Sequence, residues 1–469
     1  MMEVDTLYWG IRELGESLQK RTFSTVELTE SYLERSERLG PTLNAYATLT
    51  RDLALEQARA AEREISRGHY RGPLHGIPYA VKDLLAVRGY PTTWGARPFA
   101  KQVFDYNATV IERLTQAGAI LIGKAAMIEL AGGLGYSGGY ASFTGPAKNP
   151  WNTKCWTCGS SSGSGAVVAA ALAPFALGSD TRGSIICPSA HCGICGLRPS
   201  LGRVSRYGSM AIAYSMDKIG PMARTADDCG LVLSVIAGHD PRDHDSLPAS
   251  EAAFHYSPSA EPPTKPLRIG RMIDLYKKLA PGLASAVDEA LAVLEKHGAR
   301  ISDAKLPDGP FEEAALLTVT VEGASAFRSL VESGRAAELI DPVGQVAGYA
   351  GLEIAASDYL HVQRVRTFLQ KRIDELFDRF DVIAAASFPG TAGRLKPAPG
   401  SDSDEPDPLG GISSLCGLPA ISVPCGFSED KLPFGIQFVG RALDDHAVIA
   451  AARFFQRYTS WHIRRPPGA

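Results

Sequence analysis

Residues 158–202 read CGSSSGSGAVVAAALAPFALGSDTRGSIICPSAHCGICGLRPSLG and combine two serine-bearing loops with short apolar elements. Residues 159–165 are all glycine or serine, and the alanine-rich run 166–173 predicts a short helix capped by those serines. A proline ends this helix, and residues 175–178 predict a buried strand leading into a second hydroxyl-bearing loop, 179–184. Because the helix and the strand are small and apolar, we expect them to be core elements that hold the two loops as a functional site.

Helices and strands alternate along the rest of the chain. Residues 1–70 predict an N-terminal helical layer without chemistry, in which Ser24 and Glu27 form a capping box for a helix ending near residue 39. The order helix, glycine, strand then recurs, which is typical of a layered α/β fold. It is found at residues 108–123, 291–301 and 359–385. Polar, proline-rich segments predict surface loops at residues 246–265 and 390–407.

Composition and charge exclude some classes of protein. The 469 residues are 45% hydrophobic and 21% charged, with a formal net charge of −3. This balance offers no basic face for nucleic acid and no polybasic membrane signal. The N-terminus lacks a signal-peptide pattern, and the longest apolar run, 166–178, is too short to span a bilayer. We therefore predict a cytoplasmic protein with a small-molecule substrate and no nucleic-acid or membrane partner, and leave homo-oligomerisation open.

The eight cysteines include two Cys-x-x-Cys pairs whose spacing mimics a zinc site. These pairs are Cys155 with Cys158 and Cys192 with Cys195. We do not predict zinc, because the predicted helix and strand occupy the segment between the pairs. The interpretation we favour is that all eight are small buried residues in a reducing compartment. Cys187, three residues after Ser184, is the cysteine to watch for oxidation.

The opening stretch resembles the amidase signature family of serine hydrolases, whose pattern runs near GGSSSGSG…GTDTGGSIR…CG…GLKP…GR. Further blocks of the chain match the family in its order. They are LHGIPYAVKD at 74–83, Gly123-Lys124 with Met127 and Glu129, DKIGPMART at 217–225, GLPAISVP at 417–424 and FGIQ at 434–437. The resemblance implies one large α/β domain with a mixed β-sheet core covered by helices on both faces.

The resemblance also divides that domain. Residues 71–240 would be the catalytic core and residues 401–469 the C-terminal part of the core. Residues 241–400 carry few recognisable motifs and would shape the substrate end of the pocket. Residues 1–70 are the helical layer.

The resemblance assigns a Ser-Ser-Lys triad of Ser184 as nucleophile, Ser160 as bridging serine and Lys82 as base. The two serines stand 24 residues apart, as in the family. Taken alone, the position of Lys82 at the end of an apolar strand would suggest that its side chain extends past the apolar surface to reach solvent. The match of residues 74–83 to the family favours the catalytic role instead. An alcohol needs a base to become a nucleophile, and lysine can serve only when its pKa falls well below about 10.4. Ser160 would relay the proton between Ser184 and Lys82.

The resemblance further implies an oxyanion hole and a substrate site. The backbone N–H groups of the second loop would bind the oxyanion, namely those of Thr181, Arg182, Gly183 and Ser184. The glycine- and tyrosine-rich loop near residues 132–140 is expected to line the pocket. The substrate-binding residues we predict are Met127, Gly132, Gly133 and Tyr136. Asp83 is interpreted as a turn residue and not as a catalytic acid.

This sequence departs from the family at three positions. Cys158 replaces a glycine, Arg182 replaces the first glycine of Asp-Thr-Gly-Gly-Ser, and Ile186 stands where an arginine is usual. We predict that the Arg182 guanidinium turns away from the oxyanion position and pairs with a carboxylate, Asp180 being the first candidate. The alternative is that Arg182 points into the pocket and binds an acidic or carbonyl-rich substrate.

A competing motif lies in the same stretch. Residues 159–163 fit G-x-S-x-G, the nucleophile elbow of α/β-hydrolases, with Ser161 attacking. That elbow follows a buried strand, whereas residues 149–154 are polar and contain a proline. A P-loop is excluded because no Gly-Lys-Ser/Thr closes the glycine run.

The predicted function is hydrolysis of a carboxamide through an acyl-enzyme on Ser184, with no cofactor and no metal. One alternative is a carbamate or urea-like substrate with the same triad. Another is the glutaminase subunit of a tRNA-dependent amidotransferase, although residues 135–140 read GYSGGY where that subunit has a Ser-Thr-Glu-Asn run. The third is an inactive scaffold homologue, given Arg182 and Ile186.

Overall fold

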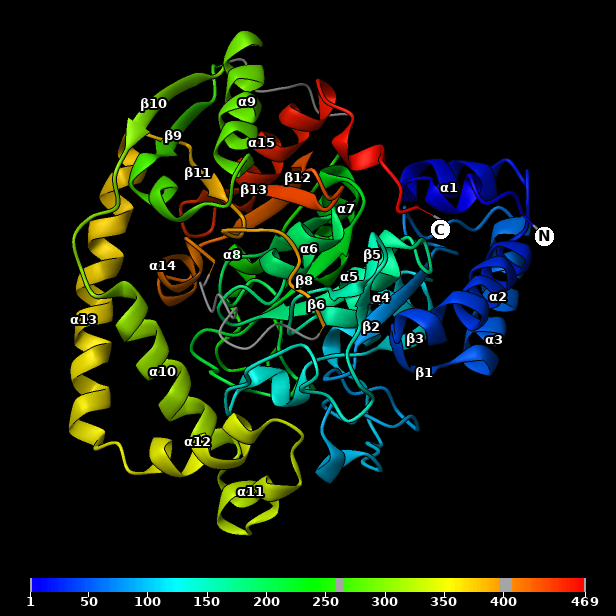
Figure 1. The fold of residues 1–469 in the computed structure, drawn as a ribbon. Coiled ribbons are helices and arrows are strands. Elements are labelled where there is room, and N and C mark those ends of the chain that lie inside the picture. The colour runs from blue at the N-terminus through cyan, green and yellow to red at the C-terminus, as the bar shows by residue number, and fades with distance from the viewer. Residues whose placement is uncertain (1, 259–264, 396–406, 468–469) are drawn as a thin grey trace.

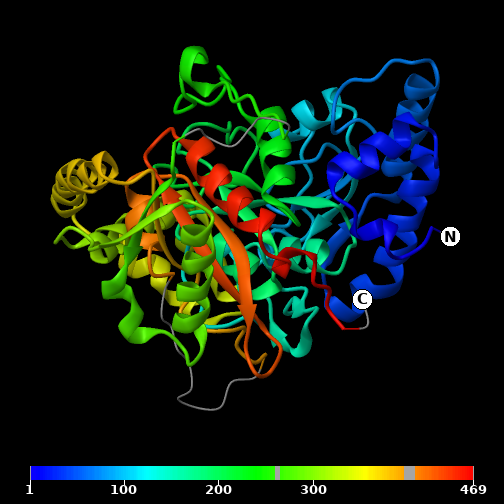
Figure 2. The ribbon, with the colours of Figure 1, turned by 90° about the horizontal axis from the view of Figure 1, so that it is seen from above.

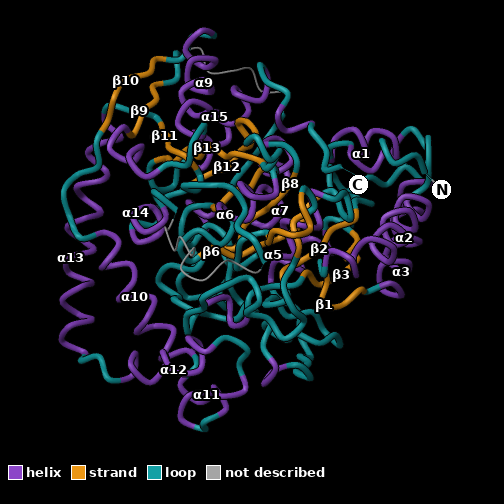
Figure 3. Tube along the Cα trace, viewed as in Figure 1, coloured by secondary structure: helices purple, strands orange, loops and turns teal. Residues whose placement is uncertain are grey.

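The mixed β-sheet passes through the middle of the molecule as one continuous band with helices outside it (Figure 3). The computed structural model describes residues 2–258, 265–395 and 407–467. Within them, eleven strands form this sheet in the order β1-β3-β2-β6-β8-β7-β12-β13-β11-β9-β10. They are β1 (Tyr46–Leu49), β2 (Pro78–Lys82), β3 (Ile120–Ala125), β6 (Phe175–Asp180), β7 (Cys195–Arg198), β8 (Lys218–Ala223), β9 (Arg268–Met272), β10 (Arg300–Ala304), β11 (Val382–Ala386), β12 (Ala420–Phe427) and β13 (Pro433–Gly440). The short strands β4 (Lys148–Asn149) and β5 (Asn152–Trp156) form a separate two-stranded sheet.

Fifteen α-helices surround the sheet within the described residues. They are α1 (Ile11–Gln19), α2 (Thr25–Leu43), α3 (Arg51–Ser66), α4 (Thr109–Gln116), α5 (Ser162–Ala169), α6 (Ile186–Cys192), α7 (Ala226–Ile236), α8 (Ala249–Ala252), α9 (Leu283–Lys296), α10 (Phe311–Ala326), α11 (Arg328–Glu332), α12 (Pro342–Leu352), α13 (Ala356–Asp374), α14 (Gly410–Leu415) and α15 (Asp445–Arg457). Figure 1 shows α1, α2 and α3 together at one edge and α10 to α13 together at the opposite edge. No helix among the described residues is both long and apolar enough to cross a membrane.

Helices cover both faces of the sheet, as the resemblance implies. In β13 an added Cβ at Gly435 would meet Ala190 of α6, whereas one at Gly440 would meet Val448 of α15. Residues an odd number apart in a strand point to opposite faces, so α6 and α15 lie on opposite sides. Figure 2 shows α15, coloured red, beside the orange strands that it contacts. The mixed sheet follows from its pairing, since β2 runs parallel to both β3 and β6 while β6 and β8 are antiparallel.

In the N-terminal helices, the predicted start of α2 is confirmed and its predicted end is not. The capping box at Ser24 and Glu27 is present, with Ser24 Oγ accepting the Glu27 N–H at 3.1 Å. Helix α2 nevertheless continues to Leu43 through Pro41 and ends at Asn44, which has a left-handed φ of 50°. The prediction that it ends near residue 39 was therefore wrong, because Pro41 lies inside the last turn of the helix and does not end it.

The central stretch differs from its prediction in detail. Helix α5 spans Ser162–Ala169, and its N-cap residue, Ser161, makes no side-chain capping bond. The Ser161 hydroxyl instead donates to the Ser179 carbonyl at 3.1 Å, so it joins the helix start to β6. A second short helix, α6, was not predicted; it contains Pro188, and proline disfavours a helix in sequence-based prediction. Of the two predicted surface loops, residues 259–264 and 396–406 lie outside the described residues.

Candidate active site

Lys82 and the two serine loops meet at one edge of the sheet. Because β2 and β6 are parallel neighbours, their carboxyl ends lie side by side, and Lys82 is the last residue of β2. Its Nζ donates to Ser160 Oγ at 2.6 Å and to Ser179 Oγ at 2.9 Å. Ser160 comes from the loop before α5, and Ser179 from the end of β6. The predicted base and bridging serine are therefore in direct contact.

The Lys82 ammonium has an unfavourable environment. Its side chain is fully buried, and among the described residues it has no ion-pair partner. Burial lowers the pKa of Lys82 to about 7, against the opposing attraction of Asp180 and Asp217. A large fraction of Lys82 is then neutral at physiological pH and can accept a proton.

Ser184 borders an open cavity. The loop after β6 lines a cavity of about 660 Å³ with Thr181, Arg182, Gly183 and Ser184. Ser184 is half-buried, and its hydroxyl makes no hydrogen bond to any described residue. Catalytic hydrogen bonds are often long or poorly aligned before substrate binds, so a free hydroxyl is compatible with a nucleophile.

Asp180 holds the shape of this loop. Its Oδ1 accepts the Gly183 N–H at 2.7 Å, and its Oδ2 accepts the Ile185 N–H at 2.8 Å. Burial opposes its ionisation, but Arg198, Lys218 and these backbone donors hold the pKa of Asp180 below its usual value. Because the Gly183 N–H already donates to Asp180, it is not free to bind an oxyanion, and of the four expected donors the N–H groups of Thr181, Arg182 and Ser184 are left as candidates.

Arg182 does turn toward a carboxylate, but the predicted partner was wrong. Its Nε lies 3.5 Å from Glu312 Oε2 of α10, with the Arg182 side chain 32% exposed. Asp180 instead faces Arg198, whose Nη1 lies 3.4 Å from Asp180 Oδ1 with both side chains fully buried. Arg198, in β7, thus supplies the cation that Ile186 does not.

The predicted substrate residues divide into two groups. Gly132, Gly133 and Tyr136 line the cavity. Met127 is 1% exposed, belongs to the main hydrophobic core and does not line it. The apolar wall was missed by sequence reasoning because the segments that form it carry no motif. It includes Trp156, Leu316, Val319 and Phe388.

Asp407 also lines the cavity and was not predicted. It is buried, and its Oδ2 has no hydrogen-bond partner among the described residues. Burial raises the pKa of Asp407 to about 7. In the sequence, the only indication of a role for Asp407 is that it is an acidic residue close to the block at 417–424.

The remaining candidates have structural roles. Ser161 is fully buried and its Oγ also accepts the Ser179 N–H at 3.2 Å. The strand before it, β5, is outside the main sheet, which counts against a nucleophile elbow at Ser161. Asp83 is buried and pairs with Lys124 Nζ at 2.8 Å, so it stabilises β2 against β3.

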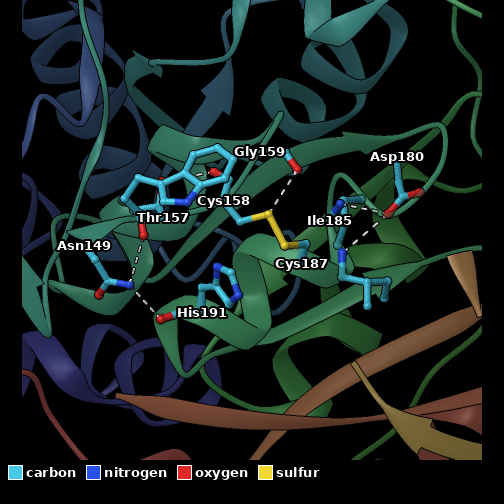
Figure 4. Close-up of a disulfide and its surroundings, with 10 residues drawn as sticks. Asn149, Thr157, Cys158, Gly159, Asp180, Ile185, Cys187 and His191 are labelled. Carbon is cyan, nitrogen blue, oxygen red and sulfur yellow. Dashed lines mark hydrogen bonds between the residues drawn. A yellow bond between two sulfur atoms is a disulfide. The ribbon is translucent and has the colours of Figure 1, made fainter. Parts of the chain in front are cut away.

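Two cysteines beside the serine loops form a disulfide, Cys158–Cys187 (Figure 4). For these two, the interpretation as free thiols was wrong. The bond joins the segment that carries Ser160 to the first turn of α6, which follows Ser184. Both cysteines line the cavity. The sequence signals were the unusual cysteine at 158 and the position of Cys187, but no local pattern pairs residues so far apart.

Known proteins resemble the chain over nearly its whole length. The model of the family described as Amidase matches residues 27–449. The A subunit of the glutamyl-tRNA(Gln) amidotransferase of Thioalkalivibrio sulfidiphilus is 38% identical, covering 98% of this chain and 99% of that protein. The peptide amidase from Stenotrophomonas maltophilia is 29% identical with a TM-score of 0.84, covering 98% of each chain. A bacterial aryl acylamidase is 26% identical with a TM-score of 0.87, covering 98% of this chain and 99% of that one.

Proposed function

The chain belongs to the amidase signature family of hydrolases acting on C–N bonds, and on that premise we propose that it cleaves a small carboxamide through an acyl-enzyme on Ser184. One observation carries the proposal: a fully buried lysine with a pKa of about 7 lies 2.6 Å from the hydroxyl of Ser160. A structural lysine would normally be buried with a carboxylate, as Lys124 is with Asp83. Hydroxyl partners leave Lys82 free to exchange a proton.

The first half-reaction builds on the contact between Lys82 and Ser160, with Ser160 proposed as the relay to Ser184. Neutral Lys82 takes a proton from Ser160 while Ser160 takes one from Ser184, whose Oγ attacks the amide carbon. The carbonyl oxygen becomes an oxyanion, which the N–H groups of Thr181, Arg182 and Ser184 would stabilise. When the tetrahedral intermediate collapses, the C–N bond breaks and Ser160 returns a proton to the leaving amine. Water then attacks the ester on Ser184 by the same route and releases the acid.

The cavity supports a substrate with an apolar part. Aromatic and aliphatic side chains from distant segments line it, including Trp156, Phe388 and Leu316. Its polar side chains include those of the loop 181–184 and Asp407, with Tyr136, Ser137 and Thr320 elsewhere on the wall. A pocket with apolar walls and a few convergent polar groups is typical of small-molecule sites. We infer an acyl group that packs on the apolar wall with its carbonyl at Ser184.

A second candidate is the glutaminase subunit of an amidotransferase. The observation in its favour is the 38% identity to the A subunit of such an enzyme, which this chain matches almost end to end. The loop at 135–140 argues against it, since it reads GYSGGY. L-glutamine is therefore a necessary member of any substrate panel.

Acyl trapping tests the proposal. The protein is incubated with apolar primary amides, an anilide, a carbamate and L-glutamine, and release of ammonia or aniline is measured. Hydroxylamine is added to capture the acyl group as a hydroxamate, and peptide mapping locates the acylated serine. Acylation of Ser184 by an apolar amide supports the proposal. Turnover of L-glutamine alone supports the second candidate, and acylation of Ser161 or of no serine overturns the mechanism.

A further inference from the structure

Three side chains that bind soft metals meet beside the active-site cavity. The sulfurs of Cys158 and Cys187 and a ring nitrogen of His191 all lie within 4.8 Å of one another, and all three residues are buried. Figure 4 shows the His191 ring next to the disulfide. Cys187 and His191 are four residues apart in α6 and therefore share one face of that helix. Cys158 reaches the same point from the loop before α5.

His191 has no structural task that explains its burial. It is 1% exposed, and neither Nδ1 nor Nε2 has a hydrogen-bond partner among the described residues. Its aromatic neighbour is Phe388, edge-on with ring centroids 4.7 Å apart. Buried ring nitrogens are normally hydrogen-bonded, because an unpaired polar atom in the interior costs free energy. Burial lowers the pKa of His191 to about 3, so its ring is neutral and keeps a lone pair.

We propose that, once the Cys158–Cys187 disulfide is reduced, Cys158, Cys187 and His191 bind one thiophilic divalent cation such as Zn²⁺. Two thiolates and one imidazole are a donor set that zinc accepts, with a fourth position left for water. Sulfurs bound to one zinc ion stand roughly 3.8 Å apart, given Zn–S distances near 2.3 Å. Rotation about the two Cα–Cβ bonds supplies that separation when the disulfide is open.

The redox step needs an external two-electron reductant, a dithiol or a phosphine. A dithiol is oxidised to its own disulfide and supplies the two electrons and two protons that convert the Cys158–Cys187 bond into two thiols. A phosphine is oxidised to its oxide, taking the oxygen atom from water, and the two protons of that water go to the sulfurs. Zn²⁺ binding then releases those two protons, because the thiolate is the ligand. Both cysteines line the cavity, so the ion can enter from there and its fourth ligand faces the cavity.

This site differs from the zinc site that the sequence spacing mimics. Cys158 is the only member of the two Cys-x-x-Cys pairs that belongs to it. Among the described residues, no other group of three His, Cys, Asp or Glu side chains is close enough to hold a metal. The inference concerns binding and does not depend on the proposed hydrolysis.

Metal titration of the full chain tests the site. The protein is reduced with a phosphine, separated from reductant without oxygen, and titrated with Zn²⁺ against a chromophoric chelator. Co²⁺ is then used as a probe, because thiolate ligands give it a charge-transfer band and tetrahedral geometry intensifies its visible bands. We expect one Zn²⁺ per reduced chain, none per oxidised chain, and a Co²⁺ spectrum of two thiolates.

Three variants localise the ion. Cys187→Ser and His191→Phe should each weaken Zn²⁺ binding by about 100-fold or more, since each removes one of three ligands. Cys425→Ser removes a buried thiol of β12 outside the cluster and should bind Zn²⁺ as the parent does. Circular dichroism establishes that each reduced protein is folded. The proposal is overturned if the reduced chain binds no Zn²⁺, if it unfolds on reduction, or if Cys187→Ser and His191→Phe bind as tightly as Cys425→Ser.

Discussion

Lys82 Nζ lies 2.6 Å from Ser160 Oγ, although the two residues are 78 positions apart in the chain. The neighbouring strand offers a direct contrast, because buried Lys124 of β3 pairs with the Asp83 carboxylate at 2.8 Å. Burial lowers the pKa of both lysines, but at Lys124 the Asp83 carboxylate in direct contact opposes that effect, whereas the side chains that Lys82 contacts are hydroxyls. Two lysines on adjacent strands therefore have different chemical roles.

The pH profile should report the ionisation of Lys82. The value of kcat/KM should rise as pH increases through about 7, because the neutral amine is the active form and burial has lowered its pKa to that value. Lys82→Met should lower kcat/KM by about 10²–10⁴-fold, the usual contribution of a general base. Steady-state kinetics between pH 5 and 9 measure both effects.

Lys218 provides the control for that profile. It is also buried, and burial lowers its pKa to about 7 as well, but its Nζ donates to the Met216 carbonyl and not to a serine hydroxyl. Lys218→Met should keep the rising limb near pH 7. If the limb disappears in Lys218→Met, the assignment to Lys82 is wrong.

Ser184→Ala should abolish turnover and leave the melting temperature almost unchanged. The Ser184 hydroxyl makes no hydrogen bond to a described residue, so its removal costs little stability while the covalent step is lost. Ser161→Ala is the matched variant, because it removes both hydrogen bonds to Ser179 and should cost about 1–3 kcal/mol of unfolding free energy. Thermal melts and activity measurements separate the two serines; retained turnover in Ser184→Ala would contradict the mechanism.

The two arginines near the catalytic loop should differ sharply in their effect on stability. Arg182 and Glu312 are both partly exposed, so Arg182→Gly should change the free energy of unfolding by less than about 1 kcal/mol. Arg198→Met leaves the buried Asp180 carboxylate without its paired cation and should cost about 3–5 kcal/mol. Urea unfolding measures both. A larger loss in Arg182→Gly than in Arg198→Met would mean that Arg182 is the partner of Asp180.

Reduction of the disulfide should destabilise the folded state. Cys158 and Cys187 are 29 residues apart, and a cross-link closing a loop of that length stabilises a protein by about 3.6 kcal/mol in the chain-entropy model. Urea unfolding of oxidised and reduced protein should show this difference, with a chelator present so that no metal binds the thiols. Equal stability of the two forms would show that the bond does not constrain the unfolded chain.

Local sequence predicted much of the fold, whereas the candidate catalytic residues were identified through the family resemblance. The alternation of helix, glycine and strand predicts the α/β layers because periodicity and chain breakers act within a few residues. The two hydroxyl loops around α5 and β6 marked a candidate site, but the roles of Ser160 and Ser184 came from the family resemblance; the local motif at 159–163 by itself would favour Ser161. Lys82 needed the family resemblance, since a lysine at the end of an apolar strand looks the same whether it snorkels or acts as a base.

Which side chains form ion pairs and which cysteines form the disulfide was decided only by the tertiary structure. Asp180 pairs with Arg198 and not with its near neighbour Arg182, because the buried carboxylate gains more from a cation that is itself buried. Arg182 reaches Glu312, which the packing of α10 brings to the cavity edge. The Cys158–Cys187 bond likewise needs α5 and α6 to be packed together. Contacts between segments far apart in the chain depend on how helices and strands pack, and no local pattern of residues encodes that packing.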